Sequence, residues 1–219
     1  MDVAFFENLI DIFAVAMLLL SMLAMASSRM LQLIRIFALQ SLMLSILAFI
    51  VAVYSGNSHI YIICVLTLVL KVIAIPKFLI YTMERIKIEK EIKPLVGIPG
   101  SLLLSAVMIL IAYIVAEPMI DSLATIGSNC LALSLSVIFI GMLMMVTRTM
   151  AITESIGLLL MENGLFLGAM TISYGMPLIV ELGVFFDVLI AVVIIGIFAY
   201  RINRTFDSVD TIFLRRLKE

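Results

Sequence analysis

The chain has 219 residues, of which 64% are hydrophobic and 13% are charged, with a formal net charge of −1 and a mean hydropathy of +1.29. Soluble domains are about half apolar and about a quarter charged, so this composition excludes a water-soluble globular protein. At about 20 residues for each membrane-spanning helix, the length predicts a single all-α integral membrane domain of about seven spans, without an added soluble domain.

Seven apolar runs are long enough to cross a bilayer and are read as membrane-spanning helices. They lie at 6–27, 35–54, 60–82, 96–116, 124–146, 153–173 and 177–200. The first run has an acidic head and is too long for the apolar part of a signal peptide, so we expect it to stay in the mature protein. We divide the chain into spans 1 to 3 (1–82), a charged loop with span 4 (83–122), a three-helix unit (123–200) and a basic tail (201–219).

Basic residues alternate between the connections and predict the orientation of the chain. Of the 14 Lys and Arg, all except Lys71 and Lys77 lie in or flank the first, third and fifth connections or lie in the tail. By the positive-inside rule, the N-terminus then lies outside and the C-terminus lies in the cytoplasm. The charged loop 84–93 and the tail are amphipathic, so each either faces the lipid headgroups or docks onto a cytoplasmic partner.

Three ionisable residues lie near the middle of predicted spans, where a charge is costly. Lys71 is on span 3, Glu162 on span 6 and Asp187 on span 7. Each would cost about 2.5–3.5 kcal/mol if it faced lipid at the bilayer centre. We therefore expect these side chains to face protein, water or one another, with Lys71 as the counter-ion of the carboxylates.

Other charges extend this set towards the two membrane surfaces and complete a candidate ion-translocation path. Towards the outside lie Glu181 on span 7 and Asp11 on span 1, and towards the cytoplasm lie Lys77 on span 3 and Glu154 on span 6. Residues six apart, such as Lys71 and Lys77, are about a third of a turn off one helix face. A relay along this set would therefore need neighbouring helices and intervening water.

A proline interrupts span 3 close to its charges. Pro76 has no amide to donate to the Val72 carbonyl, so the helix should break there and leave a polar backbone group beside a lysine. A broken helix with charges at the break can line a water path. The alternative is an ordinary proline kink, with Lys77 reaching for the cytoplasmic surface.

Span 6 also carries a stripe of glycines. Gly157, Gly164 and Gly168 are seven and four residues apart and therefore share one helix face. Small residues on one stripe let two membrane helices approach closely. We expect this stripe to be a packing surface and Glu162 to point roughly the opposite way.

Ligands for metals and redox groups are scarce in the sequence. His59 is the only histidine, and Cys64 and Cys130 each stand alone in an apolar stretch. These residues cannot supply a haem ligand pair, an iron–sulfur cluster or a tetrahedral zinc site. The chain also has no glycine-rich phosphate loop and no HExxH motif. We therefore expect no bound cofactor or metal, no catalytic residue and no nucleic-acid partner, and we assign any redox chemistry to partner proteins.

The C-terminal part of the chain carries a pattern of known membrane subunits. The pattern is a basic turn at Thr147-Arg148, then Ser155-Ile-Gly157 through Glu162-Asn163-Gly164, and then Phe185-Phe-Asp187. Residues 130–200 resemble the K-type subunit of complex I and the C-type subunit of multisubunit cation/proton antiporters. With seven spans and a Lys71-x-x-x-x-Pro76 segment, nearly the whole chain resembles component E of hydrogenase-4 and of formate-hydrogenlyase-type membrane complexes.

The resemblance can be carried over residue by residue. Asp187, Asn163 and Arg148 fall on the family pattern. The carboxylate of the family's second helix aligns with Leu159, and Glu162 lies one turn further along nearly the same face. Its role would then be preserved by a one-turn shift.

The first half of the chain echoes the second. Residues 29–40 repeat the basic turn, with Gln40 in place of the carboxylate, and Lys71 then takes the place of Asp187. Spans 1 to 3 and 5 to 7 would form a parallel repeat joined by span 4.

The resemblance implies a non-catalytic membrane subunit of a complex-I-like hydrogenase in a prokaryotic cytoplasmic membrane. Its buried charges would join a proton- or sodium-translocating axis beside antiporter-like subunits, while nickel–iron and iron–sulfur subunits in the cytoplasm carry the redox chemistry. Two alternatives stay open. The charges form a fixed ion-pair network in a structural linker, or the chain belongs to a cation/proton antiporter without a hydrogenase.

Overall fold

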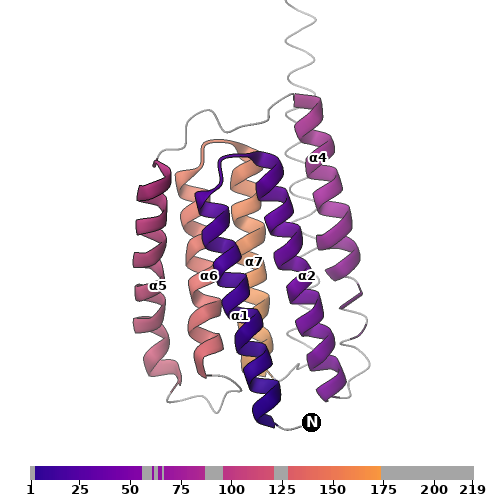
Figure 1. Cartoon of the computed structure of the whole chain (residues 1–219), viewed down its shortest axis with the longest axis vertical. Coiled ribbons are helices and arrows are strands. Elements are labelled where there is room, and N and C mark those ends of the chain that lie inside the picture. The colour runs from indigo at the N-terminus through magenta and orange to yellow at the C-terminus, as the bar shows by residue number, and fades with distance from the viewer. Residues whose placement is uncertain are drawn as a thin grey trace, which may run out of the picture.

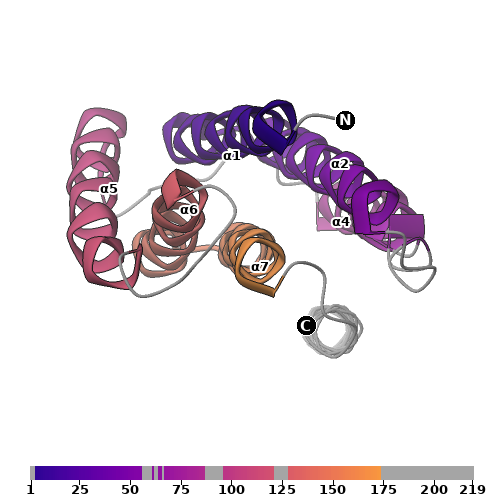
Figure 2. The same ribbon diagram turned by 90° about the horizontal axis from the view of Figure 1, so that it is seen from below.

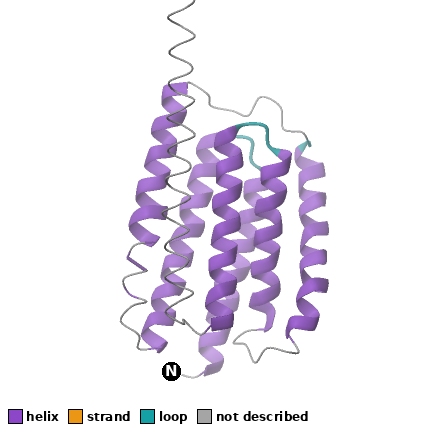
Figure 3. Cartoon of the chain, turned by 180° about the vertical axis from the view of Figure 1, so that it is seen from behind, coloured by secondary structure: helices purple, strands orange, loops and turns teal. Residues whose placement is uncertain are grey.

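The computed structural model of the protein describes residues 3–55, 61, 64–65, 67–86, 96–120 and 128–173, and the elements within these ranges are helices (Figure 3). They are α1 (Val3–Ala26), α2 (Met30–Ser55), the π-helix η1 (Leu68–Ala74), α4 (Ile75–Ile86), α5 (Ile98–Ile120), α6 (Ser128–Thr147) and α7 (Ala151–Ser173). The prediction of an all-α fold is confirmed for this part of the chain.

Four of these helices are long and apolar enough to cross a membrane. The apolar segments are Asn8–Ala26, Met30–Val53, Ile98–Met119 and Asn129–Thr147, which correspond to predicted spans 1, 2, 4 and 5. Predicted span 6 corresponds to α7, and the later part of span 3 corresponds to η1 and α4. The predicted span 177–200, most of the charged loop and the tail 201–219 lie outside the described residues.

Helix α2 begins earlier than its apolar run. The run starts at residue 35, but the helix begins at Met30, so Arg35 lies more than one turn inside it. The Arg35 side chain is exposed. A long basic side chain near a helix end can lie along apolar surface and still reach the membrane surface, so it need not mark the helix boundary.

The helices pack side by side in two rows (Figure 2). One row contains α1, α2 and α4, and the other contains α5, α6 and α7. Between the rows, α1 packs against α5 and α6, and α2 packs against α7. The α1–α2 and α6–α7 connections lie at the same end of the bundle (Figure 1). We call this the basic end, because Arg29 and Arg148 lie in these two connections.

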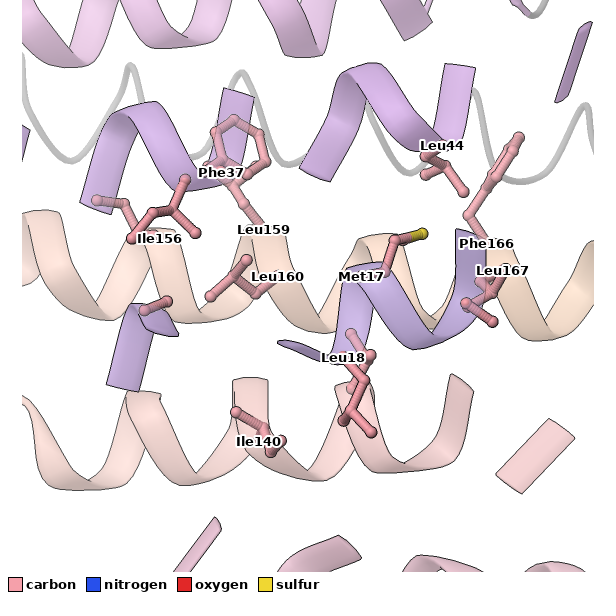
Figure 4. Packing of buried hydrophobic residues seen from close by; sticks show 14 of the residues in the cluster. Met17, Leu18, Phe37, Leu44, Ile140, Ile156, Leu159, Leu160, Phe166 and Leu167 are labelled. Atoms are coloured by element: carbon pink, nitrogen blue, oxygen red, sulfur yellow. The ribbon is translucent and has the colours of Figure 1, made fainter. Parts of the chain in front are cut away.

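The apolar core lies between α1, α2, α6 and α7 (Figure 4). Buried members include Met17 from α1, Phe37 and Leu44 from α2, and Leu160 and Leu167 from α7. Lipid is as apolar as these side chains, so close packing and interhelical hydrogen bonds hold such helices together more than the removal of apolar surface from water does.

Glycines let α6 and α7 approach each other closely. A Cβ atom added at Gly141 of α6 would lie 2.6 Å from the backbone nitrogen of Met161. On α7, a Cβ at Gly164 would lie 2.9 Å from the Ile138 backbone nitrogen, and one at Gly168 would lie 2.9 Å from Ser134 Oγ. A Cβ at Gly157 would also meet α6, 3.0 Å from Met145. The predicted glycine stripe therefore faces α6, and Gly141 faces it from the other helix.

We expect Gly141→Ala to lower the thermal stability of the full chain in mild detergent. The added methyl group would meet backbone atoms of α7, and forced overpacking costs about 1–3 kcal/mol. The matched control is Gly97→Ala, where the nearest atom to a new Cβ is Pro99 Cδ at 3.9 Å. An equal unfolding temperature for the two variants would contradict the close packing of α6 and α7.

A buried polar chain as the candidate functional site

Lys71 lies in the middle of the π-helix η1, five residues before Pro76. In this segment the Ile75 amide donates to the Leu70 carbonyl, five residues back, instead of four as in an α-helix. Because Pro76 has no amide, the regular α-helical pattern cannot continue through it. The helix break predicted from the sequence thus takes the form of a π-helix, and short π-segments occur frequently at functional sites.

The Lys71 ammonium is fully buried and lies between two polar side chains of α7. Its Nζ is 3.3 Å from Glu162 Oε1 and donates a hydrogen bond of 3.2 Å to Asn163 Oδ1. It also lies 5.9 Å from the ring centroid of Phe166. The Lys71 side chain has no exposed surface and that of Glu162 is 6% exposed, so the ion pair that the sequence predicted is present and is shielded from solvent.

Asn163 connects this ion pair to the first two helices. Its Nδ2 donates to Gln40 Oε1 at 3.2 Å and to Ser41 Oγ at 3.1 Å, while its Oδ1 accepts from Lys71. Both hydrogens of the Asn163 amide therefore have an acceptor on α2. The side chain is fully buried, so these contacts satisfy a group that would otherwise be costly inside the bundle.

Gln40 extends the hydrogen bonds to α1. Its Nε2 donates to Ser21 Oγ at 2.9 Å and to the Met17 carbonyl at 3.1 Å. We call the connected set the polar chain; its members are Glu162, Lys71, Asn163, Gln40, Ser41 and Ser21. It joins α7, η1, α2 and α1 through buried residues. Its two charges are of opposite sign.

Arg148 has a different role in the structure, at the basic end. Its Nη2 donates to the carbonyls of Met25 at 2.8 Å and Ser27 at 2.9 Å, with a longer contact of 3.5 Å to Ala24. The Ala24 and Met25 carbonyls belong to the last turn of α1, whose last four carbonyls lack partners within the helix, and Ser27 directly follows it. The buried guanidinium therefore caps α1 and ties it to the α6–α7 connection.

The other predicted path residues are not part of the polar chain. Lys77 is exposed on α4, and Glu154 is exposed in the first turn of α7. Pro76 is buried next to η1. Asp187 and Glu181 lie outside the described residues.

Sequence reasoning missed Ser21 and Ser41, and it noted Gln40 only as an echo of the family pattern. Gln40 could have been found as an amide within an apolar run. Leu159 is fully buried in the apolar core, whereas Glu162 reaches Lys71. The one-turn shift of the family carboxylate from Leu159 to Glu162 stays a prediction.

Comparisons with known proteins bear on the identity of this bundle. The chain is 30% identical over 148 residues to the protein named hydrogenase-4 component E in Escherichia coli K12, and the match covers 68% of each protein. The chain belongs to the hydrogenase-4 component E family. The chain is also 30% identical over 148 residues to the hydrogenase-4 component E of Shigella flexneri.

The chain is also similar to an uncharacterized protein of Mycobacterium tuberculosis. It is 34% identical over 131 residues, and the match covers 60% of each chain. No protein-family model and no solved structure matches the chain. The family therefore rests on sequence relatives, and these fit a membrane subunit of a hydrogenase complex.

We expect Lys71→Met and Glu162→Gln each to destabilise the full chain by about 3–5 kcal/mol, because each leaves a buried charge without its counter-charge. The double variant, which removes both charges, should unfold closer to the wild-type temperature. Thermal unfolding in mild detergent measures both effects, with Glu154→Gln as a matched control on the exposed face of α7. Additive losses in the double variant would show that the two charges are not coupled.

We expect Arg148→Gln to loosen the C-terminal end of α1. The variant removes hydrogen bonds of a charged donor, each worth about 1.5–3 kcal/mol. Hydrogen–deuterium exchange should rise in the peptide containing residues 24–29, and the control Arg29→Gln, at an exposed arginine, should leave exchange in α6 and α7 unchanged. Unchanged exchange at the end of α1 in Arg148→Gln would refute the cap.

Proposed function

We propose that this chain is a non-catalytic membrane subunit of a complex-I-like hydrogenase, and that its polar chain forms part of a proton- or sodium-translocating axis. The observation that carries the proposal is the Lys71–Glu162 ion pair, 3.3 Å long and buried between helices. Ionisable residues inside a membrane bundle are costly and commonly mark ion paths. Membership of the hydrogenase-4 component E family supports the assignment to a hydrogenase complex.

The two kinds of side chain in the polar chain would do different work. Glu162 and Lys71 can each gain or lose a proton, so a proton passed to Glu162 cancels its charge and weakens its hold on the ammonium. The amides of Asn163 and Gln40 do not exchange protons readily, and they fix the position of Lys71 by hydrogen bonds. The serine hydroxyls can both donate and accept.

We further propose seven spans with the N-terminus outside and the C-terminus in the cytoplasm. The arrangement of the described helices supports this orientation, because Arg29 and Arg148 lie in connections at one end of the bundle (Figure 1). The last turn of α4 and the first turn of α5 lie at that same end. The positive-inside rule then assigns the basic end to the cytoplasm of a prokaryotic cell.

Asp187, with Glu181 nearer the outside, would continue the axis beyond Glu162. In this proposal the neighbours are antiporter-like membrane subunits, and the nickel–iron and iron–sulfur centres belong to cytoplasmic partners. The chain itself would bind no cofactor. A mutation in this chain could then stop ion movement while the reaction at the metal centre continues.

A structural linker is the second candidate, and the saturated Asn163 amide favours it. A side chain with a partner at each polar atom holds three helical segments, α7, η1 and α2, in register whether or not ions move. In this case the ion-pair network specifies assembly and the translocation path runs through other subunits.

The double variant Lys71→Met with Glu162→Gln distinguishes these candidates in the complex purified from its native membrane. It avoids an uncompensated charge, so we expect the complex to assemble and to turn over hydrogen. Ion uptake by inverted vesicles during hydrogen turnover should fall at least about tenfold, a loss typical of removing one required proton-transfer group. Asp187→Asn should act in the same way, while Glu154→Gln should not.

Mass spectrometry of everything that co-purifies with the tagged chain provides the second readout. A nickel–iron hydrogenase subunit with antiporter-like proteins is the expected set. Normal ion uptake in an assembled double variant would reject the relay and leave the linker. Co-purification of antiporter subunits without a hydrogenase would reject the assignment to a hydrogenase complex.

A further inference from the structure

A groove lies between the C-terminal end of α1 and the beginning of α2, away from the polar chain. Its volume is about 380 Å³, and its lining is Leu23, Ala26, Ser27, Gln32, Arg35 and Ile36. Three of these residues are apolar and three carry hydrogen-bonding groups. The groove therefore has an apolar part and a polar part, and it lies at the basic end of the bundle.

The polar part of the groove presents donors. Ser27 Oγ donates to Gln32 Oε1 at 3.1 Å, which occupies the amide oxygen and leaves the amide hydrogens of Gln32 directed elsewhere. Arg35 contributes a guanidinium with five N–H donors, and among the described residues no carboxylate pairs with it. Gln32 and Arg35 are both exposed. This combination of donors and one positive charge suits an anion.

The apolar part of the groove continues as a stripe along α1. Ile12, Val15, Leu19 and Leu23 are 64%, 44%, 60% and 56% exposed and recur at helical spacing. At 1.5 Å per residue the stripe is about 17 Å long. Half of the hydrocarbon core of a bilayer is about 15 Å thick, so the stripe matches the length of one acyl chain.

In a bilayer that covers the apolar segments of α1 and α2, the groove would lie at the depth of the lipid headgroups. The apolar segment of α1 ends at Ala26 and that of α2 begins at Met30, so Ser27 lies just beyond the apolar segment of α1. Arg35 is about one and a half turns into α2, from where its long side chain can reach the same level. Basic pockets between membrane helices at the cytoplasmic surface can bind anionic lipid headgroups.

We propose that this groove binds an anionic phospholipid, with the phosphate held by Arg35 and Gln32 and one acyl chain lying along the stripe from Leu23 to Ile12. A free phosphate ion would use the same donors but not the stripe. An acidic segment of a partner protein would use the charge but has no need of an apolar surface of acyl-chain length.

The chain contains no tryptophan, so a single introduced tryptophan can report on the groove. Leu23→Trp places the reporter at the groove, and Leu103→Trp, near the start of α5 and 67% exposed, reports on bulk lipid at a comparable depth. The full chain is reconstituted in vesicles of phosphatidylcholine and phosphatidylglycerol, and either lipid is supplied in brominated form as a fluorescence quencher.

We expect brominated phosphatidylglycerol to quench Leu23→Trp about fivefold more effectively than brominated phosphatidylcholine, the preference that one arginine near an anionic surface can give. For Leu103→Trp, the ratio of quenching by brominated phosphatidylglycerol to quenching by brominated phosphatidylcholine should be near one. Adding Arg35→Gln to Leu23→Trp should bring the ratio close to one, whereas adding Arg29→Gln, an exposed arginine of the same connection that does not line the groove, should leave it unchanged.

Four results would overturn the proposal. Equal ratios at the two reporters would mean no preference for anionic lipid at the groove. An equal effect of Arg29→Gln and Arg35→Gln would point to general surface charge. Loss of the preference on adding inorganic phosphate would identify a free-anion site. Quenching of Leu103→Trp without any quenching of Leu23→Trp would mean that protein covers the groove.

Discussion

The attraction between one ammonium and one carboxylate, away from water, is the constraint on which the arrangement of η1 and α7 depends. Neither charge has a low-energy position facing lipid, and each is stabilised by the other across 3.3 Å. Because Lys71 lies in a π-helix, its direction differs from that in a regular helix, and the neighbouring Pro76 keeps the regular pattern from forming. The backbone irregularity and the ion pair therefore form one structural unit.

Hydrogen bonds carry this constraint from the ion pair to the rest of the bundle. The Asn163 side-chain oxygen accepts from Lys71, and its nitrogen donates to Gln40 on α2. The Gln40 nitrogen in turn donates to Ser21 on α1. Apolar packing alone permits many rotations of a membrane helix about its axis, since lipid and protein surfaces are similarly apolar. Polar contacts that must be satisfied favour one rotation of each helix that takes part in them. The glycine faces of α6 and α7 fix the rotation of these two helices against each other by close packing.

The sequence allowed the fold class and the central ion pair to be predicted, because a charged residue in an apolar run is costly unless it faces protein, water or an opposite charge. It did not reveal Ser21 and Ser41, since serines are common in membrane helices and most bond only to their own backbone, as Ser21 also does to Met17. Lys77 and Glu154 were assigned to the path on depth alone, which says nothing about the rotation of a helix. Both side chains are exposed and lie outside the polar chain, so their part in a relay stays a prediction. Gly141 was overlooked because one glycine makes no stripe, although it lies against the backbone of α7.

The guanidinium cap of Arg148 has a mechanical consequence. It holds the end of α1 against the connection between α6 and α7 by hydrogen bonds, so these three helices are joined at the basic end. The last turn of α5 and the first turn of α6 lie at the other end of the bundle (Figure 1). If the helices separate, they turn about these hydrogen bonds, and their displacement grows with distance from the basic end. Polar groups halfway along the bundle would then move less than those near the opposite end.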